Sequence, residues 1–135
     1  MPYLVSDWMS KPVVVVAADS SVSYAMTLMR RRRIHSIVVD TGEKNAGYGI
    51  VTTTDIRDKI VAKNRNPAEV TVREIMSGPI ITGRADWTLM ECSQLMGEHK
   101  FHHLPIADEQ GVLIGLISAT DIFIAVEEQG WEEEK

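Results

Sequence analysis

Short runs of β-branched residues alternate along the chain with stretches in which apolar residues recur every three or four positions. The run at 13–16 is all valine and predicts a strand. An amphipathic helix should follow, with its N-cap among Asp19, Ser20 and Ser21. Its apolar stripe consists of Val22, Ala25, Met26 and Met29. Residues 34–39 and 48–52 predict two more strands, and a second helix should begin near Asp55.

The second half of the chain repeats this pattern. A displacement of 67 residues places the Met-Ser-Lys-Pro turn at 9–12 on Met-Ser-Gly-Pro at 76–79. After one deletion the displacement is 66, and Gly-Ile-Val-Thr-Thr-Thr-Asp-Ile at 49–56 falls on Gly-Leu-Ile-Ser-Ala-Thr-Asp-Ile at 115–122. The second copy has its own helical stripe at Leu89, Cys92 and Met96, and strands are expected at 80–82, 101–106 and 112–118.

These patterns predict an α+β fold with α/β-type units, in which two βαββα repeats occupy residues 4–63 and 70–126. A unit of about 60 residues is marginal alone, so we expect the copies to pack about a pseudo-twofold axis. Gly42 and Asn45 mark a loop in copy one, and 109–111 a tighter turn in copy two. Residues 63–67 read as the linker, and the acidic tail 127–135 should be exposed or frayed.

Composition narrows the function classes. The chain has 135 residues, 24% of them charged, and a net charge of −5, which disfavours nucleic acid as a partner. No apolar run is long enough to span a bilayer, and the N-terminus lacks the pattern of a secretory signal. Cys92 is the only cysteine, so no intrachain disulfide can form. We therefore expect a cytoplasmic protein that does not associate with membranes.

The ordered set of motifs, present twice, resembles a tandem pair of CBS domains (cystathionine β-synthase domains), known as a Bateman module. The resemblance covers residues 4–126. It rests on Met-Ser-x-Pro, on Ile-His-Ser-Ile-Val-Val-Asp and Phe-His-His-Leu-Pro-Ile-Ala-Asp, and on Gly-h-h-(Thr/Ser)-x-x-Asp, where h is apolar. The resemblance implies a regulatory module that binds adenosine-containing ligands in clefts between its repeats. It also implies a homodimer, whose signal would pass to an unknown protein target.

Such a ligand needs an acceptor for the ribose diol, and carboxylates serve this role in dinucleotide folds. Asp55 and Asp121 are the candidates, although a plain helix-start aspartate would be the better interpretation if either stood alone. Thr52 and Ser118 could donate a hydroxyl to phosphate, beside helix N-termini that favour anions. The resemblance also implies that Val14, Val16, Ile81 and Thr82 line the adenine slots, and the alternative is that they belong to plain core strands.

The histidines allow more than one interpretation. The resemblance places His35 and His102 near the phosphate end of the clefts, and a structural histidine bonded to a carbonyl is an equal alternative. A metal site at His99, His102 and His103 is disfavoured, because adjacent strand residues point to opposite faces. Mg²⁺ could accompany ATP. The arginines at 30–33 read as a solvent-facing helix end, with phosphate contact as the alternative.

No catalytic residues are predicted, because no nucleophile–base spacing, phosphate-binding glycine loop or paired carboxylates stand out. The expected function is a non-catalytic sensor of AMP, ADP, ATP, NAD or S-adenosylmethionine that needs no cofactor. The alternative is an interaction module, for dimerisation or partner binding, with empty clefts. Pro105 stands where copy one has Val38, so the two sites should not be equivalent.

Overall fold

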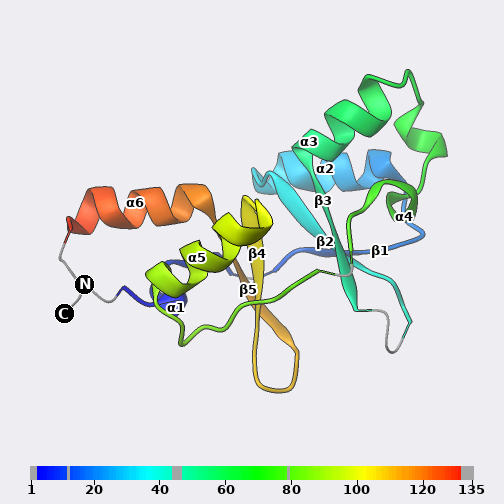
Figure 1. Ribbon diagram of the computed structural model, residues 1–135. Coiled ribbons are helices and arrows are strands. Elements are labelled where there is room, and N and C mark those ends of the chain that lie inside the picture. The colour runs from blue at the N-terminus through cyan, green and yellow to red at the C-terminus, as the bar shows by residue number, and fades with distance from the viewer. Residues whose placement is uncertain (1–2, 12, 44–46, 79, 132–135) are drawn as a thin grey trace. The chain divides into compact units, whose positions relative to one another are not determined.

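The computed structural model describes residues 3–11, 13–43, 47–78 and 80–131, and its chain divides into two compact units (Figure 1). One unit is Val14–Ile80. The other combines Met1–Val13 with Ile81–Lys135. Pro12, Pro79, Asn45 and the last four residues of the acidic tail lie outside the described residues. The α+β fold class is confirmed, because each unit contains both helices and strands.

The unit of residues 14–80 has the predicted strand–helix–strand–strand–helix order. Strand β1 (Val15–Ala17) pairs in parallel with β2 (Ser36–Asp40), which pairs antiparallel with β3 (Tyr48–Thr52). The helices are α2 (Val22–Arg32), α3 (Thr53–Ile56), its π-helical continuation η1 (Arg57–Val61), the 3₁₀ turn η2 (Pro67–Glu69) and α4 (Val72–Ile75). Figure 1 draws α3 and the residues after it as one coil.

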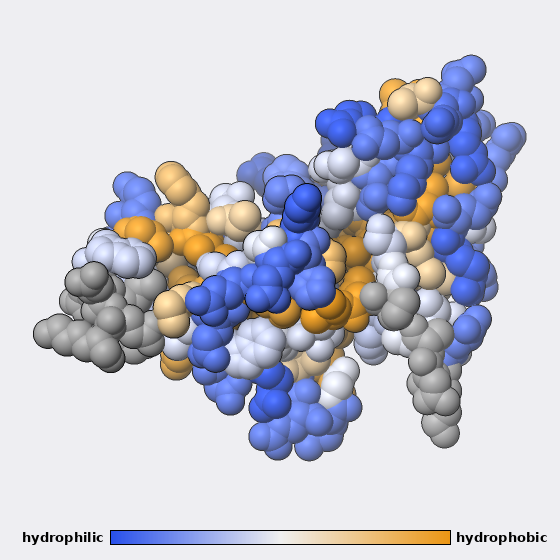
Figure 2. Space-filling model, in the orientation of Figure 1, coloured by the Kyte–Doolittle hydropathy of each residue, from blue (hydrophilic) through white to orange (hydrophobic). Residues whose placement is uncertain are grey.

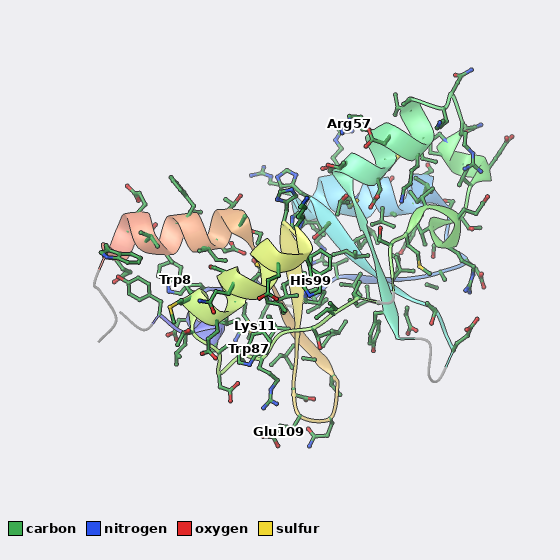
Figure 3. All side chains as sticks on the ribbon, viewed as in Figure 1. Trp8, Lys11, Arg57, Trp87, His99 and Glu109 are labelled. Carbon is green, nitrogen blue, oxygen red and sulfur yellow. The ribbon has the colours of Figure 1, made fainter. Side chains whose placement is uncertain are left out.

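The other unit is built from α1 (Val5–Trp8), α5 (Leu89–His99), β4 (His103–Ala107), β5 (Leu113–Ser118) and α6 (Ala119–Gln129). Strands β4 and β5 form an antiparallel hairpin. Its tight turn was predicted at 109–111, where Gly111 adopts a φ of +83° and Glu109 lies at the tip (Figure 3). The first residues of the acidic tail, 127–129, are helical and exposed rather than frayed.

The first strand predicted for copy two, at 80–82, is wrong: these residues form no strand, and the adjacent Gly83 makes a single parallel bridge to Ile106. In copy one, the Val38 N–H donates to the Val14 carbonyl at 3.2 Å. The equivalent residue in copy two is Pro105, which has no N–H to donate. The ladder therefore loses a hydrogen bond. In copy one, β1 and β2 each begin two residues later than the strands predicted at 13–16 and 34–39.

Each unit takes its leading segment from the other sequence repeat. In the unit of residues 14–80, Val72 N–H donates to the Ser20 carbonyl at 2.9 Å. The matching bond in the other unit runs from Val5 N–H to the Trp87 carbonyl, also at 2.9 Å. Since the same exchange occurs twice, a compact unit is not the same set of residues as a sequence repeat.

A methionine of each leading segment lies against the glycine of the third strand. A Cβ added to Gly49 would lie 2.5 Å from Sδ of Met76, and one added to Gly115 would lie 2.5 Å from Sδ of Met9. In each case the glycine leaves room for the methionine. This contact links two motifs that the sequence shows separately.

Each unit has its own apolar core. The predicted stripes are confirmed at Val22, Ala25 and Met29 of α2, and at Leu89, Cys92 and Met96 of α5, all of them buried. Met26 is the exception, with 36% of its surface exposed. Apolar residues also reach the surface over α6 (Figure 2), where Phe123 is 68% exposed.

Candidate ligand sites at two matching helix starts

The two motif aspartates each close a capping box. Thr52 is the N-cap of α3: Asp55 N–H donates to its hydroxyl at 3.2 Å, and Thr52 N–H donates to Asp55 Oδ2 at 2.9 Å. Ser118 caps α6 in the same way, with Asp121 N–H donating to Ser118 Oγ at 3.1 Å and Ser118 N–H to Asp121 Oδ2 at 2.8 Å. Both aspartates therefore fill the role of a helix-start acid.

We call Thr52, Asp55 and His35 the copy-one site, and Ser118, Asp121 and His102 the copy-two site. The main chain holds each histidine beside its helix start: His35 carbonyl accepts Thr53 N–H at 3.0 Å, and His102 carbonyl accepts Ala119 N–H at 2.9 Å. Both histidines are exposed residues. The structure thus brings the predicted phosphate and ribose residues together within each unit.

The Asp55 carboxylate has partners that the motif did not predict. The Thr52 hydroxyl donates to Oδ2 at 3.1 Å, and Lys59 Nζ lies 3.1 Å from Oδ1. Lys59 Nζ also donates to the Ile75 carbonyl at 2.8 Å. The i, i+4 spacing of Asp55 and Lys59 is a sequence signal that could have revealed this pair.

The two sites also differ at Ser36 of copy one. It pairs with Thr52 across the β2–β3 ladder, so the two side chains lie on the same face of the sheet. Ser36 is 2% exposed, and its hydroxyl has no hydrogen-bond partner within the described residues. Its counterpart in copy two is His103, opposite Ser118. A buried hydroxyl without a partner carries a desolvation cost that a bound polar group could remove.

A surface hollow lies beside each histidine, and the two hollows match residue by residue under the repeat displacements. The first, of about 400 Å³, is lined by Met26, Met29, Arg30, Arg33, Ile34, His35, Thr53 and Ile56. The second, of about 570 Å³, is lined by Ser93, Met96, Gly97, Lys100, Phe101, His102, Ala119 and Ile122. The repeated motif thus produces a repeated surface feature.

The two hollows differ in charge and in volume. Arg30 and Arg33 flank the first, whereas Gly97 and Lys100 occupy those positions in the second. All four arginines at 30–33 are exposed at the C-terminal end of α2, as the solvent-facing interpretation predicted. In the second hollow, Phe101 is stacked on His99 with ring centroids 5.2 Å apart. The second hollow is therefore less cationic, and by volume it is also the larger of the two.

The residues predicted for the adenine slots do not share one environment. Val16 is buried in the core of its unit, and Val14 packs partly buried against that core. Ile81 and Thr82 are exposed. None of the four lines either hollow, so their contact with a base stays a prediction.

Other chemistry gains no support from the described residues. In the parts of the chain that the structure describes, no three His, Cys, Asp or Glu side chains gather as metal ligands would. Over the same ranges, no helix has both the length and the apolar character needed to cross a membrane. Burial raises the pKa of the Cys92 thiol to about 11, so the thiol stays protonated at neutral pH.

Comparison with known proteins agrees with the duplicated architecture. The CBS domain family model matches residues 5–62 and again 72–128. The chain therefore belongs to the CBS-domain family, and CBS-domain pairs are regulatory modules. The protein MK0525 of Methanopyrus kandleri is 38% identical over 109 residues, or 79% of this chain. The present chain spans 56% of the length of that relative.

Solved structures share the fold. A putative signal-transduction protein with CBS domains from Burkholderia ambifaria has a TM-score of 0.79 and 32% identity, over 93% of this chain and 94% of its own. The CBS domain pair of protein MJ0100 has a TM-score of 0.81 and 23% identity, over 96% of this chain and 99% of its own. That pair was solved in complex with 5′-methylthioadenosine and S-adenosyl-L-methionine.

Proposed function

We propose that this chain is a non-catalytic regulatory module that binds an adenosine-containing ligand at one or both of its duplicated helix starts. The observation that carries the proposal is the repeated placement of a hydroxyl residue, an aspartate and a histidine within each unit. The MJ0100 pair, with the same fold, binds two adenosine compounds. The ligand class is therefore an adenosine derivative such as AMP, ADP, ATP, NAD or S-adenosylmethionine.

Each site offers a different group to each part of such a ligand. Asp55 or Asp121 accepts hydrogen bonds from the ribose hydroxyls. Thr52 or Ser118, with His35 or His102, faces a phosphate, and a protonated histidine binds it more strongly. Mg²⁺ would enter only with a nucleotide such as ATP. The ligand signals by favouring one arrangement of the chain, which requires different affinities for the two arrangements.

A thermal-shift series tests the proposal, with AMP, ADP, ATP, NAD, S-adenosylmethionine, 5′-methylthioadenosine and, as a control, GTP. A ligand that binds only the folded state adds about 2.7 kcal/mol at 100 times its Kd, which raises Tm by several degrees. The expected result is a rise with adenosine compounds and none with GTP. An unchanged Tm across the series would refute the proposal.

A second candidate function is a protein-interaction module with empty ligand sites. It is favoured by the exposed apolar residues of α6 and the segment after it, because Phe123 is 68% and Trp131 71% exposed. A flat thermal-shift series, together with a dimer seen by light scattering, would favour this candidate. The homodimer itself stays a prediction under either function.

A further inference from the structure

The two candidate sites differ most at the aspartate. Within the described residues, Asp55 has partners at both carboxylate oxygens, whereas Asp121 has a partner at one. Asp55 Oδ2 accepts the N–H and the hydroxyl of Thr52, and Oδ1 faces Lys59. The Asp55 side chain is only 14% exposed. These three contacts occupy most of the roughly four acceptor positions of a carboxylate. A ribose diol must therefore displace a partner before both of its hydroxyls can bind Asp55.

Lys59 is itself held on two sides. Its Nζ lies 3.1 Å from Asp55 Oδ1 and donates to the Ile75 carbonyl at 2.8 Å, which joins the copy-one site to α4. The Lys59 side chain is 43% exposed, so solvent screens the ion pair and a ligand could still break it. We expect Lys59 to weaken ligand binding at the copy-one site without preventing it.

Copy two has no lysine at the position equivalent to Lys59. The residue four positions after Asp121 is Ala125, which is fully buried. Across the described residues, Asp121 Oδ2 accepts only the Ser118 N–H, and Oδ1 has no hydrogen bond or ion pair. A ribose diol can therefore bind Asp121 Oδ1 without displacing another group.

We propose that Lys59 holds the copy-one site closed, so that an adenosine ligand fills the copy-two site first. This inference rests on the proposed function and adds which site is used and which residue decides it. The buried Ser36 hydroxyl fits a closed site: it lies on the Thr52 side of the sheet, has no partner within the described residues, and is 2% exposed. When Lys59 releases Asp55, a ligand that enters the site would give the Ser36 hydroxyl a hydrogen-bond partner.

Calorimetric titration with 5′-methylthioadenosine tests this inference on the full chain. This probe carries no phosphate, so removal of a lysine cannot weaken it through lost phosphate contact. The wild type should bind one equivalent tightly, with any second site at least about tenfold weaker. Lys59→Gln should strengthen the second site about tenfold, which corresponds to about 1.4 kcal/mol. Adding Asp55→Asn to Lys59→Gln should abolish that gain.

Two controls separate the possible failures. Lys63→Gln removes the same charge from an exposed lysine that has no ion pair within the described residues, and it should bind like the wild type. Asp121→Asn should remove the tight site. Equal affinities at two wild-type sites, or no change in Lys59→Gln, would overturn the role of Lys59 alone. No binding by either protein, alongside a flat thermal-shift series, would refute the proposed function as well.

Discussion

Two methionine–glycine contacts, one in each unit, connect the leading segments to the third strands. A methyl group at either position would enter the space of the methionine side chain, so that side chain would have to move. For Gly49 the Ser77 carbonyl oxygen would also lie 3.2 Å from the added carbon, and backbone yields less readily than a side chain. The two glycines thus have a packing role in addition to any effect on a ligand.

Gly49→Ala should lower the free energy of unfolding by about 1–3 kcal/mol, the usual cost of overpacking. Gly115→Ala should cost less, because its added methyl group meets only the flexible side chain of Met9. Urea unfolding measures this. Combining Gly49→Ala with Met76→Ala should cost less than the sum of the two single changes, because the shorter side chain leaves space.

Gly97→Ala is the matched control for both glycine variants. It lies inside α5 with no atom within 4 Å of the added carbon, so it should stabilise by about 0.5–1 kcal/mol through helix propensity. If all three glycine variants lose the same stability, the methionine contacts do not explain the glycines.

At the scale of elements, the short helix α4 depends on one carboxylate. The Glu74 side chain accepts the Thr71 N–H at 3.0 Å and a hydrogen bond from Arg65 at 3.0 Å. The backbone bond from Thr71, with help from Arg65, lowers the pKa of Glu74. The stability that the charged Glu74 side chain adds is therefore fully present above the usual glutamate pKa. It is lost as the pH falls through the lowered pKa.

Glu74→Gln should destabilise the protein at neutral pH. Its difference from the wild type should shrink as the pH falls below the usual glutamate pKa and through the lowered one, where the wild-type carboxylate takes up its proton. Urea midpoints across this range measure the effect. A difference that stays constant with pH would mean that the charge of Glu74 does not support α4.

Sequence reasoning predicted most elements and the residues at both helix starts, because hydrophobic period and capping chemistry are local. It failed where the outcome depends on a neighbour that is distant in sequence. Pro105 lacks a backbone N–H, and this matters only if a neighbouring strand needs that donor. The absence of the first strand of copy two could therefore be seen only in the sheet itself. The contact between Lys59 and the Ile75 carbonyl depends on how α4 packs.

At the scale of the whole chain, the exchanged leading segments decide which residues unfold together. Val72 and Ile75 belong to the second sequence repeat, yet they are buried in the core of the unit that holds β1, β2 and β3. Val5 belongs to the first repeat and is buried with β4 and β5. A perturbation should therefore spread within a compact unit rather than within a sequence repeat.

Hydrogen exchange on two cavity variants checks this. Ile75→Ala should cost about 2–5 kcal/mol and accelerate exchange in β2 and β3, with a smaller effect on β4 and β5. Val5→Ala should do the reverse. The assignment of units would be wrong if Ile75→Ala instead accelerated exchange mainly in β4 and β5, which belong to its own repeat.

The central claim is that an adenosine ligand binds at the duplicated helix starts, and an NMR titration of the ¹⁵N-labelled chain with 5′-methylthioadenosine tests it most directly. The account predicts that the amides of 118–122 move first, and that those of 52–56 respond only at higher ligand concentration. It also predicts that Lys59→Gln brings the two responses together. Saturable shifts elsewhere in the chain, with both helix starts unchanged, would contradict the account.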